Sequence, residues 1–334
     1  MNNIAAKSSV KVNKSLNVVK CLAVFAIICI HCLLSKLGDG GKAIDSLCRF
    51  AVPIFFLISG YFSFFSNNYD FALKKYKSRI VKLLKLLIIS NVAYLIFSAL
   101  ISHKHYLSSL MDVHAWLDII IFNNSPNAVA LWFIQALIYC YVIYYLMARF
   151  KVNPNKLYIL IPFLLIACII FGEVFKIYGI KIDSFIYRNF LFLGLPFFTL
   201  GYLINDRQDE ITKKISDRTI VITIILGCIL SIFERLTIGS SNLFIGSIPV
   251  SLMMFIWCVK YPDKLNFKVI GWIGGNLYTL MYILHPMVIG FVIKHLHINF
   301  GYLNPFMIFT ITAIISTVVF HLINLRKLKD SKSY

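Results

Sequence analysis

The amino-acid sequence predicts an all-α integral membrane protein: a bundle of about ten transmembrane helices with both termini in the cytoplasm. Three observations lead to this fold class, namely the composition, the recurrence of long apolar runs and the uneven distribution of basic residues. Of the 334 residues, 59% are hydrophobic and only 14% are charged. Soluble domains are roughly half apolar and a quarter charged, so this chain is built for a lipid environment.

Ten apolar runs account for the predicted spans, and each is close to the roughly 20 residues that a helix needs to cross the hydrocarbon core. Short polar segments separate them. The longest, at 102–128, is expected to lie along the membrane interface as an amphipathic turn. Residues 1–334 are predicted to form one membrane domain with short basic ends at 1–14 and 325–334. The runs lie at residues 15–35, 47–65, 80–101, 129–148, 157–175, 185–204, 218–235, 242–260, 272–293 and 303–324.

The basic residues set the predicted orientation. The formal net charge of +19 does not indicate nucleic-acid binding, because the lysines and arginines recur in short clusters between apolar runs and form no single patch. With the N-terminus inside, the inner segments hold 24 of the 33 Lys and Arg residues. Cytoplasmic loops of membrane proteins carry such an excess, so we expect both termini to be cytoplasmic.

The eight cysteines all lie inside or at the edge of apolar runs, which argues against a framework of extracellular disulfides. Cys29, His31 and Cys32 have the residue types of a metal site. On one helix, however, His31 points about 200° away from Cys29, so the three side chains do not converge. We therefore expect the thiols to pack as small apolar groups and predict no metal site.

Ionisable residues inside apolar spans are costly and are the first candidates for function. Lys20 lies near the inner end of its span, and the other charged candidates fall in the outer halves of theirs. Several separate helices thus place polar groups at one depth, which predicts a polar cavity open to, or just below, the outer surface. These residues are Lys20, His31, Arg49, Arg188, Glu234, Arg235 and His285, with Gln135 as an uncharged companion.

Each of these residues also has a purely structural interpretation, and the sequence leaves both the structural and the functional interpretation open. Arginines near span ends extend their charged heads to the interface, and Glu234 with Arg235 fits a pair at a loop edge. A membrane histidine often makes one interhelical hydrogen bond. Trp132 would be an interface anchor, and Lys20 would mark the cytoplasmic boundary.

Three segments together resemble the acyltransferase-3 family. In the first helix of that family an aspartate is followed three residues later by an arginine and eleven residues further on by a histidine; here the same positions hold Asn17, Lys20 and His31. Residues 49–61 look like the second-helix signature and read RFAVPIFFLISGY. Residues 282–286 are similar to a late tyrosine–histidine element and read YILHP.

The resemblance implies transfer of an acyl group, usually acetyl, from cytosolic acyl-CoA to a hydroxyl of a surface glycan or its lipid-linked precursor, with no permanently bound cofactor. Such a transfer needs a base and a stabiliser of the developing oxyanion. His31 is the candidate base or, alternatively, a nucleophile that carries the acyl group. Arg49 and Arg188 are candidates for oxyanion or phosphate contacts. The expected catalytic residues are His31, Arg49 and His285, and the expected substrate-binding residues are Lys20, Trp132, Gln135, Arg188 and Tyr282.

A carrier or flippase for a glycan or lipid-linked sugar is the alternative, since it would need the same helices and buried charges. The sequence lacks the matching pair of Gly- or Pro-broken helices that such transporters carry in their two halves. A ligand-sensing domain is a third interpretation without positive support. The usage of Ile, Lys, Asn and Phe is typical of an AT-rich bacterial genome, so we expect a multi-pass protein of a bacterial plasma membrane, in contact with lipids. The acceptor and the oligomeric state stay open.

Overall fold

The structure is a computed structural model, and the residues it describes form helices and no strands. It describes residues 12–66, 68–102 and 129–330, together with Leu117, Ile120, Ile121 and Asn123. Most of the predicted interface segment at 102–128 lies outside this part. The α-helices are α1 (Lys14–His31), α2 (Asp39–Leu47), α3 (Ala51–Tyr61), α4 (Tyr69–Phe97), α7 (Trp132–Arg149), α8 (Leu160–Ile169), α9 (Phe175–Ile177), α10 (Ser184–Tyr187), α11 (Leu195–Asp206), α12 (Gln208–Lys214), α13 (Asp217–Thr237), α14 (Ser247–Lys260), α15 (Lys268–Asn276), α16 (Tyr278–Ile289) and α17 (Asn304–Asp330).

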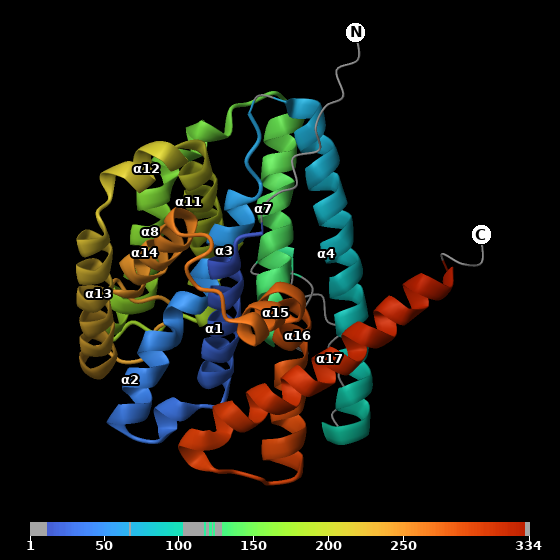
Figure 1. Ribbon diagram of the computed structural model, residues 1–334. Coiled ribbons are helices and arrows are strands. Elements are labelled where there is room, and N and C mark those ends of the chain that lie inside the picture. The colour runs from blue at the N-terminus through green and yellow to red at the C-terminus, as the bar shows by residue number, and fades with distance from the viewer. Residues whose placement is uncertain are drawn as a thin grey trace.

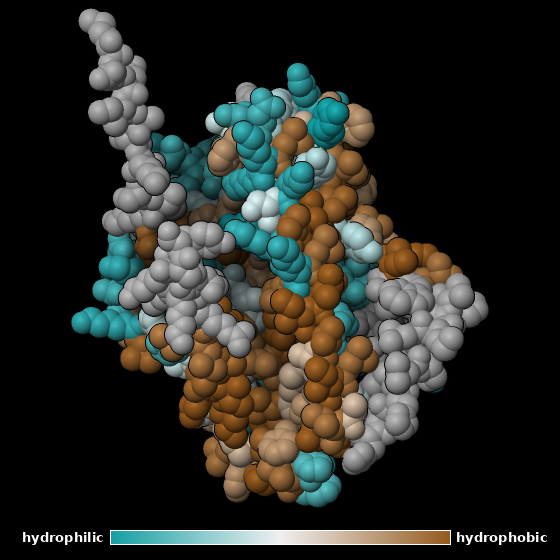
Figure 2. All heavy atoms as spheres, turned by 90° about the vertical axis from the view of Figure 1, so that its right-hand side faces the viewer, coloured by the Kyte–Doolittle hydropathy of each residue, from teal (hydrophilic) through white to brown (hydrophobic). Residues whose placement is uncertain are grey.

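The helices form a bundle with α1 at its centre. Helix α1 packs against α3, α15 and α16, and α17 crosses the bundle obliquely (Figure 1). Most of the side chains of α1 are buried, whereas α4 exposes a row of large apolar residues of the kind that faces lipid. That row contains Val81, Leu84, Ile88, Ile89, Val92 and Ile96. The face that carries α4 is hydrophobic over its middle and lower parts and hydrophilic at its upper end (Figure 2).

Each of the ten predicted runs contains helix, which confirms the all-α, multi-span class. In the described part of the chain, seven helices are long and apolar enough to cross a membrane, or up to eight if a bent pair counts as one span. Two further apolar helices, Phe190–Asp206 and Ser247–Lys260, are shorter. The number of ten spans is therefore not confirmed.

The second span begins earlier than predicted. The segment that reads as a polar loop at Gly38–Gly41 instead starts helix α2, and α2 continues through a 3₁₀ turn into α3, so one apolar helix runs over Asp39–Tyr61. Gly38 adopts a φ of 89° just before the helix, a conformation that favours glycine. Asp39 then lies in the first turn, where the helix dipole stabilises a carboxylate.

The ninth predicted span is not straight. It breaks between α15 and α16, and the two parts meet at a bend of 82°. The break lies where α15 approaches α1 most closely. A Cβ atom on Gly274 would lie 1.9 Å from the Asn17 carbonyl oxygen, so only glycine permits this contact.

Hydrogen bonds at or next to the ends of helices mark two ends of the bundle. At one end Asn205 donates to the carbonyl oxygen of Tyr61, and Lys260 donates to that of Ile215. At the other, Tyr302 donates to the Leu37 carbonyl oxygen (2.6 Å). We call the first, which joins the connections at 62–68, 150–153, 207–216 and 261–267, the basic end. The second, which joins those at 32–38, 178–183, 238–246 and 296–300, is called the far end.

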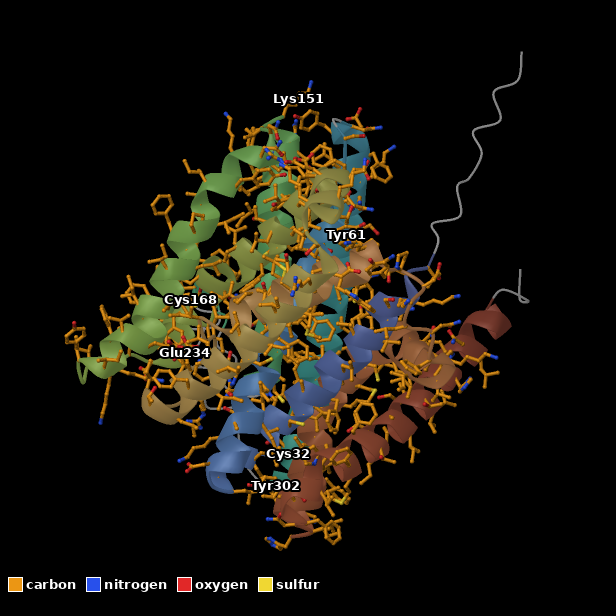
Figure 3. All side chains as sticks on the ribbon, turned by 60° about the vertical axis from the view of Figure 1, so that its left-hand side comes forward. Cys32, Tyr61, Lys151, Cys168, Glu234 and Tyr302 are labelled. Carbon is orange, nitrogen blue, oxygen red and sulfur yellow. The ribbon has the colours of Figure 1, made fainter. Side chains whose placement is uncertain are left out.

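Lys151 lies at the basic end, and Cys32 and Tyr302 lie at the far end (Figure 3). Every connection at the basic end belongs to, or directly adjoins, a segment that the charge distribution assigns to the cytoplasm. That the basic end faces the cytoplasm stays a prediction of the charge distribution.

Two neighbouring glycines of α15 test the close approach to α1. Gly274→Ala should lower the melting temperature of the protein in detergent, because its methyl group has no room, and overpacking costs about 1–3 kcal/mol. Gly271→Ala is the matched control: its Cβ atom would lie 3.9 Å from Val18, an ordinary contact, and alanine favours the helix. Equal melting temperatures for the two variants would contradict the tight α1–α15 contact.

Candidate functional site

The two predicted membrane histidines lie next to each other. His31 is the last residue of α1, and His285 lies in α16, with ring centroids 5.0 Å apart. His285 is fully buried, and His31 is partly exposed. Arg188, Arg49 and Asp45 are close enough to His31 to interact with it electrostatically. The site therefore lies toward the far end, as expected from the depth of these residues in the sequence.

One hydrogen bond sets the orientation of the His285 ring. Its Nδ1 lies 3.2 Å from the Met281 carbonyl oxygen, one helical turn earlier. A carbonyl oxygen only accepts, so Nδ1 carries the proton and Nε2 of the neutral ring keeps its lone pair. This Nε2 is buried and has no hydrogen-bond partner among the described residues. The ring is thus held with a proton acceptor free beside His31.

Arg49 is fixed by a buried carboxylate. Asp45, one turn earlier in the continuous α2–α3 segment, accepts from Arg49 at 2.8 Å and 3.0 Å. Arg235 of α13 donates to the same carboxylate at 3.3 Å. The Asp45 side chain is only 4% exposed, so this shared ion pair lies inside the protein.

Arg188 is positioned by a turn and by an aromatic ring. Asn189, the next residue, accepts from the backbone N–H groups of Leu191 and Phe192 and so begins the following helix. The guanidinium of Arg188 then lies 5.3 Å from the centroid of the Trp132 ring. Arginine stacks well on tryptophan through a cation–π contact. Trp132 is buried and not an interface anchor.

Tyr282 and Gln135 are the remaining predicted site residues outside Lys20. The Tyr282 hydroxyl donates to the Ala130 carbonyl oxygen, which ties α16 to the start of α7. The Tyr282 ring lies 5.8 Å from that of His285. Gln135 is buried one turn beyond Trp132 on α7, and its Oε1 has no hydrogen-bond partner in the described structure.

Lys20 lies away from this group. It precedes His31 by eleven residues on the same helix, which places it about 16 Å closer to the basic end. Its amino group contacts Asn17 at 3.3 Å and lies 5.2 Å from the centroid of the Tyr278 ring. Arg79 of α4 is close enough to interact with Lys20 electrostatically. Lys20 therefore belongs to a second, cationic position.

A pocket lies between these two positions. It is a partly open pocket of about 80 Å³ between α3, α4, α7 and α16, and its lining is mostly apolar. Tyr278, beside Lys20, and Tyr282, beside His285, both line it. The other lining residues are Phe55, Ile58, Ser59, Leu83, Leu86, Phe133, Ile134, Leu137 and Thr279.

Two features of the site were not predicted correctly. Asp45 was missed, although its i, i+4 spacing from Arg49 is the sequence signal of a helical ion pair. The interpretation of Glu234 and Arg235 as a pair at a loop edge is wrong. Arg235 pairs with Asp45, and Glu234 is 3% exposed and accepts from the Gly246 backbone N–H.

The cysteines are packed as expected: none forms a disulfide, and all but the half-buried Cys228 are buried. Among the described residues, no group of histidine, cysteine and acidic side chains has the arrangement of a metal site.

Comparison with known proteins gives one match. A family model described as an acyltransferase domain, the acyltransferase-3 family, matches residues 13–324, nearly the whole chain. No curated protein and no solved structure matches the chain.

Removing the shared carboxylate tests the ion pair at the far end. Asp45→Asn should destabilise the protein by about 3–5 kcal/mol, because it leaves two buried guanidiniums without a countercharge. Asp39→Asn, in the exposed pair with Lys42, should change stability by at most about 1 kcal/mol. Thermal unfolding in detergent measures both. If Asp45→Asn is as mild as Asp39→Asn, the Arg49–Asp45–Arg235 contact does not hold the far end together.

Proposed function

The chain belongs to the acyltransferase-3 family, and on that premise we propose that it is an O-acyltransferase moving an acetyl or other acyl group from cytosolic acyl-CoA to a hydroxyl of a surface glycan or its lipid-linked precursor. One observation carries this proposal: an apolar pocket between α3, α4, α7 and α16 is lined by Tyr278, which lies next to Lys20, and by Tyr282, which lies next to His285 of the histidine pair. A CoA thioester has the matching parts, namely anionic phosphates, a long uncharged arm and a reactive carbonyl.

The cationic position would receive the phosphates of CoA. Lys20 of α1 and Arg79 of α4 interact there, and Lys75, one turn before Arg79, interacts with Arg79 as well. Tyr278, under the Lys20 amino group, is the first residue of α16, and the first turn of a helix generally offers N–H groups that favour an anion. Phosphate is favoured both by lysine and arginine and by such a helix end.

The apolar lining would hold the pantetheine arm. Arg79, Leu83 and Leu86 recur at i, i+4 and i+7 and therefore share one face of α4. The two leucines line the pocket. A donor held by Arg79 would thus lay its uncharged arm against Leu83 and Leu86 and direct its thioester toward Tyr282.

At the histidine pair the chemistry needs no further cofactor. As the acceptor oxygen forms its bond to the thioester carbonyl carbon, its proton passes to a neutral imidazole. The carbon–sulfur bond then breaks, and the imidazolium returns the proton to the departing thiolate. His31 is the proposed base, and Arg49 and Arg188 would stabilise the oxyanion formed in between.

A transient acyl-histidine on His31 fits the same geometry. In that route the imidazole nitrogen attacks the thioester first, CoA leaves as the thiol, and the acceptor hydroxyl then takes the acyl group from the ring. His285, whose Nε2 is free and buried, would then serve as the base that takes the acceptor proton.

Substitution of His31 tests the chemistry. His31→Ala should lower the release of free thiol from acetyl-CoA about 10²–10⁴-fold, because it removes the proposed general base. His321→Ala, an exposed histidine of α17, is the control and should keep full activity. Residual activity above about a tenth in a monodisperse His31→Ala protein excludes this role. Uptake of a glycan by the unaltered protein without any thiol release supports a carrier instead.

The cationic position makes a separate, graded prediction. Lys20→Gln or Arg79→Gln should raise the KM for acetyl-CoA by roughly tenfold and leave kcat at saturation little changed, since a hydrogen bond to a charged group contributes about 1.5–3 kcal/mol. Lys213→Gln, an exposed lysine of α12 at the same end, should have no effect.

Steady-state kinetics in proteoliposomes, with acetyl-CoA on one face only, measures this. Turnover that requires acetyl-CoA on the face of the far end would refute the arrangement.

A further inference from the structure

The charges around His31 do not balance. Arg49 and Arg235 share one carboxylate, that of Asp45, and Arg188 beside them forms no ion pair in the part of the chain that the structure describes. Arg188 interacts electrostatically with Arg49, a like charge. The next carboxylates, Glu173 and Glu234, interact electrostatically with each other, and among the described residues neither forms an ion pair with these arginines. Glu173 also interacts with Lys176, a further positive charge that acts on Arg49 and Arg235.

This excess of positive charge is held in a poorly hydrated place. The side chains of Arg49 and Arg235 are 13% and 10% exposed, and Arg188 lies against the buried ring of Trp132. Buried charges in proteins are nearly always paired, because an unpaired one loses its hydration without compensation. The cluster thus has a place for an additional anion.

Two of these arginines also have hydrogen-bond donors without partners. The Nε atoms of both Arg49 and Arg188 are buried, and neither has a hydrogen-bond partner within the described structure. Buried donors are rarely left unpaired. The planar guanidinium fork matches the two oxygens of a carboxylate or a phosphate, so these donors favour a group with that geometry.

In the arrangement proposed above, the donor substrate does not supply this anion. The CoA phosphates are assigned to Lys20, about 16 Å away along α1. The oxyanion of the reaction exists only while the acyl group is being transferred, so it does not balance the cluster before the reaction starts. A group present in the ground state is required, and the acceptor is the molecule that must lie beside His31 at that time.

We infer that the Arg49–Arg188 pair is an acceptor subsite and that the acceptor is an anionic glycan, with a carboxylate or phosphate close to the hydroxyl that is acylated. This inference rests on the proposed acyl transfer for its location and names the class of acceptor. Arg235 and Asp45 serve it indirectly, since Asp45 holds Arg49 in place. An acceptor without such a group would leave both guanidiniums unpaired and bind weakly.

Direct binding tests this with the full chain in lipid nanodiscs, loaded with CoA. The probes are methyl glucuronide and glucose 1-phosphate as anionic sugars, methyl glucoside as the neutral match, and inorganic phosphate. At least one anionic sugar should bind about tenfold or more tightly than the glucoside, and its affinity should fall with added salt. Equal binding of glucoside and both anionic sugars overturns the inference.

Variants locate the site. Arg188→Gln should weaken binding of the preferred anionic sugar about tenfold, whereas Arg149→Gln, an exposed arginine at the basic end, should not change it. Arg188→Lys keeps the charge without the fork and should lose less, which keeps the test available if the glutamine variant fails to fold. If the folded variants that can be prepared, Arg188→Gln and Arg188→Lys, all bind the anionic sugar as tightly as the unaltered protein, the assignment is wrong.

Two outcomes separate the sources of the anion and the two proposals. If inorganic phosphate binds as tightly as glucose 1-phosphate, the pair is a site for free anions and the acceptor assignment is wrong. If anionic sugars bind through Arg188 but no His31-dependent thiol release occurs, the acyl-transfer proposal fails while the subsite stands. If thiol release occurs but the protein shows no preference for the anionic sugars, the subsite inference fails while the acyl-transfer proposal stands.

Discussion

The Asp45 carboxylate is the interaction on which the far end depends. It connects the α2–α3 segment to α13 through Arg235 and fixes Arg49 beside His31. A carboxylate whose side chain is 4% exposed in a membrane protein requires firm pairing, and here two arginines supply it. Because both share one negative charge, the pairing holds the backbone together and still leaves positive charge for a ligand.

The second constraint is the close packing of α1. Glycine at Gly274 lets α15 approach α1, and the bend that follows places Tyr278 under Lys20 and directs α16 along the pocket. The same helix α1 that carries Lys20 also carries His31 at its other end. The distance between the cationic position and the histidine pair is therefore fixed by one rigid element.

The histidines and arginines of the site could be predicted from the sequence, because each interrupts an apolar run and most fall within recognisable segments. Asp45 was missed because it precedes the run at 47–65, in a stretch whose glycines read as a loop, and its i, i+4 spacing from Arg49 indicates an ion pair only where that stretch is helical. Hydropathy reports whether a segment is apolar but not its direction, so the bend after Gly274 was hidden within one apolar run. The contact of Lys20 with Tyr278 depends on that bend and therefore could not be predicted from the sequence either.

The apolar lining of the pocket also bears on how well the membrane holds its ion gradients. A protein that passes a substrate arm through a bilayer risks leaking protons and salt whenever the arm is absent. Phe55, Leu83 and Leu86 make the empty pocket a poor place for water, and narrow hydrophobic passages block ions by dewetting. The hydrogen bond from Tyr282 to Ala130 ties α16 to α7 beside the histidines. In the proposed function, the same apolar surface that would accept the uncharged chain of the donor would thus insulate the membrane electrically between turnovers.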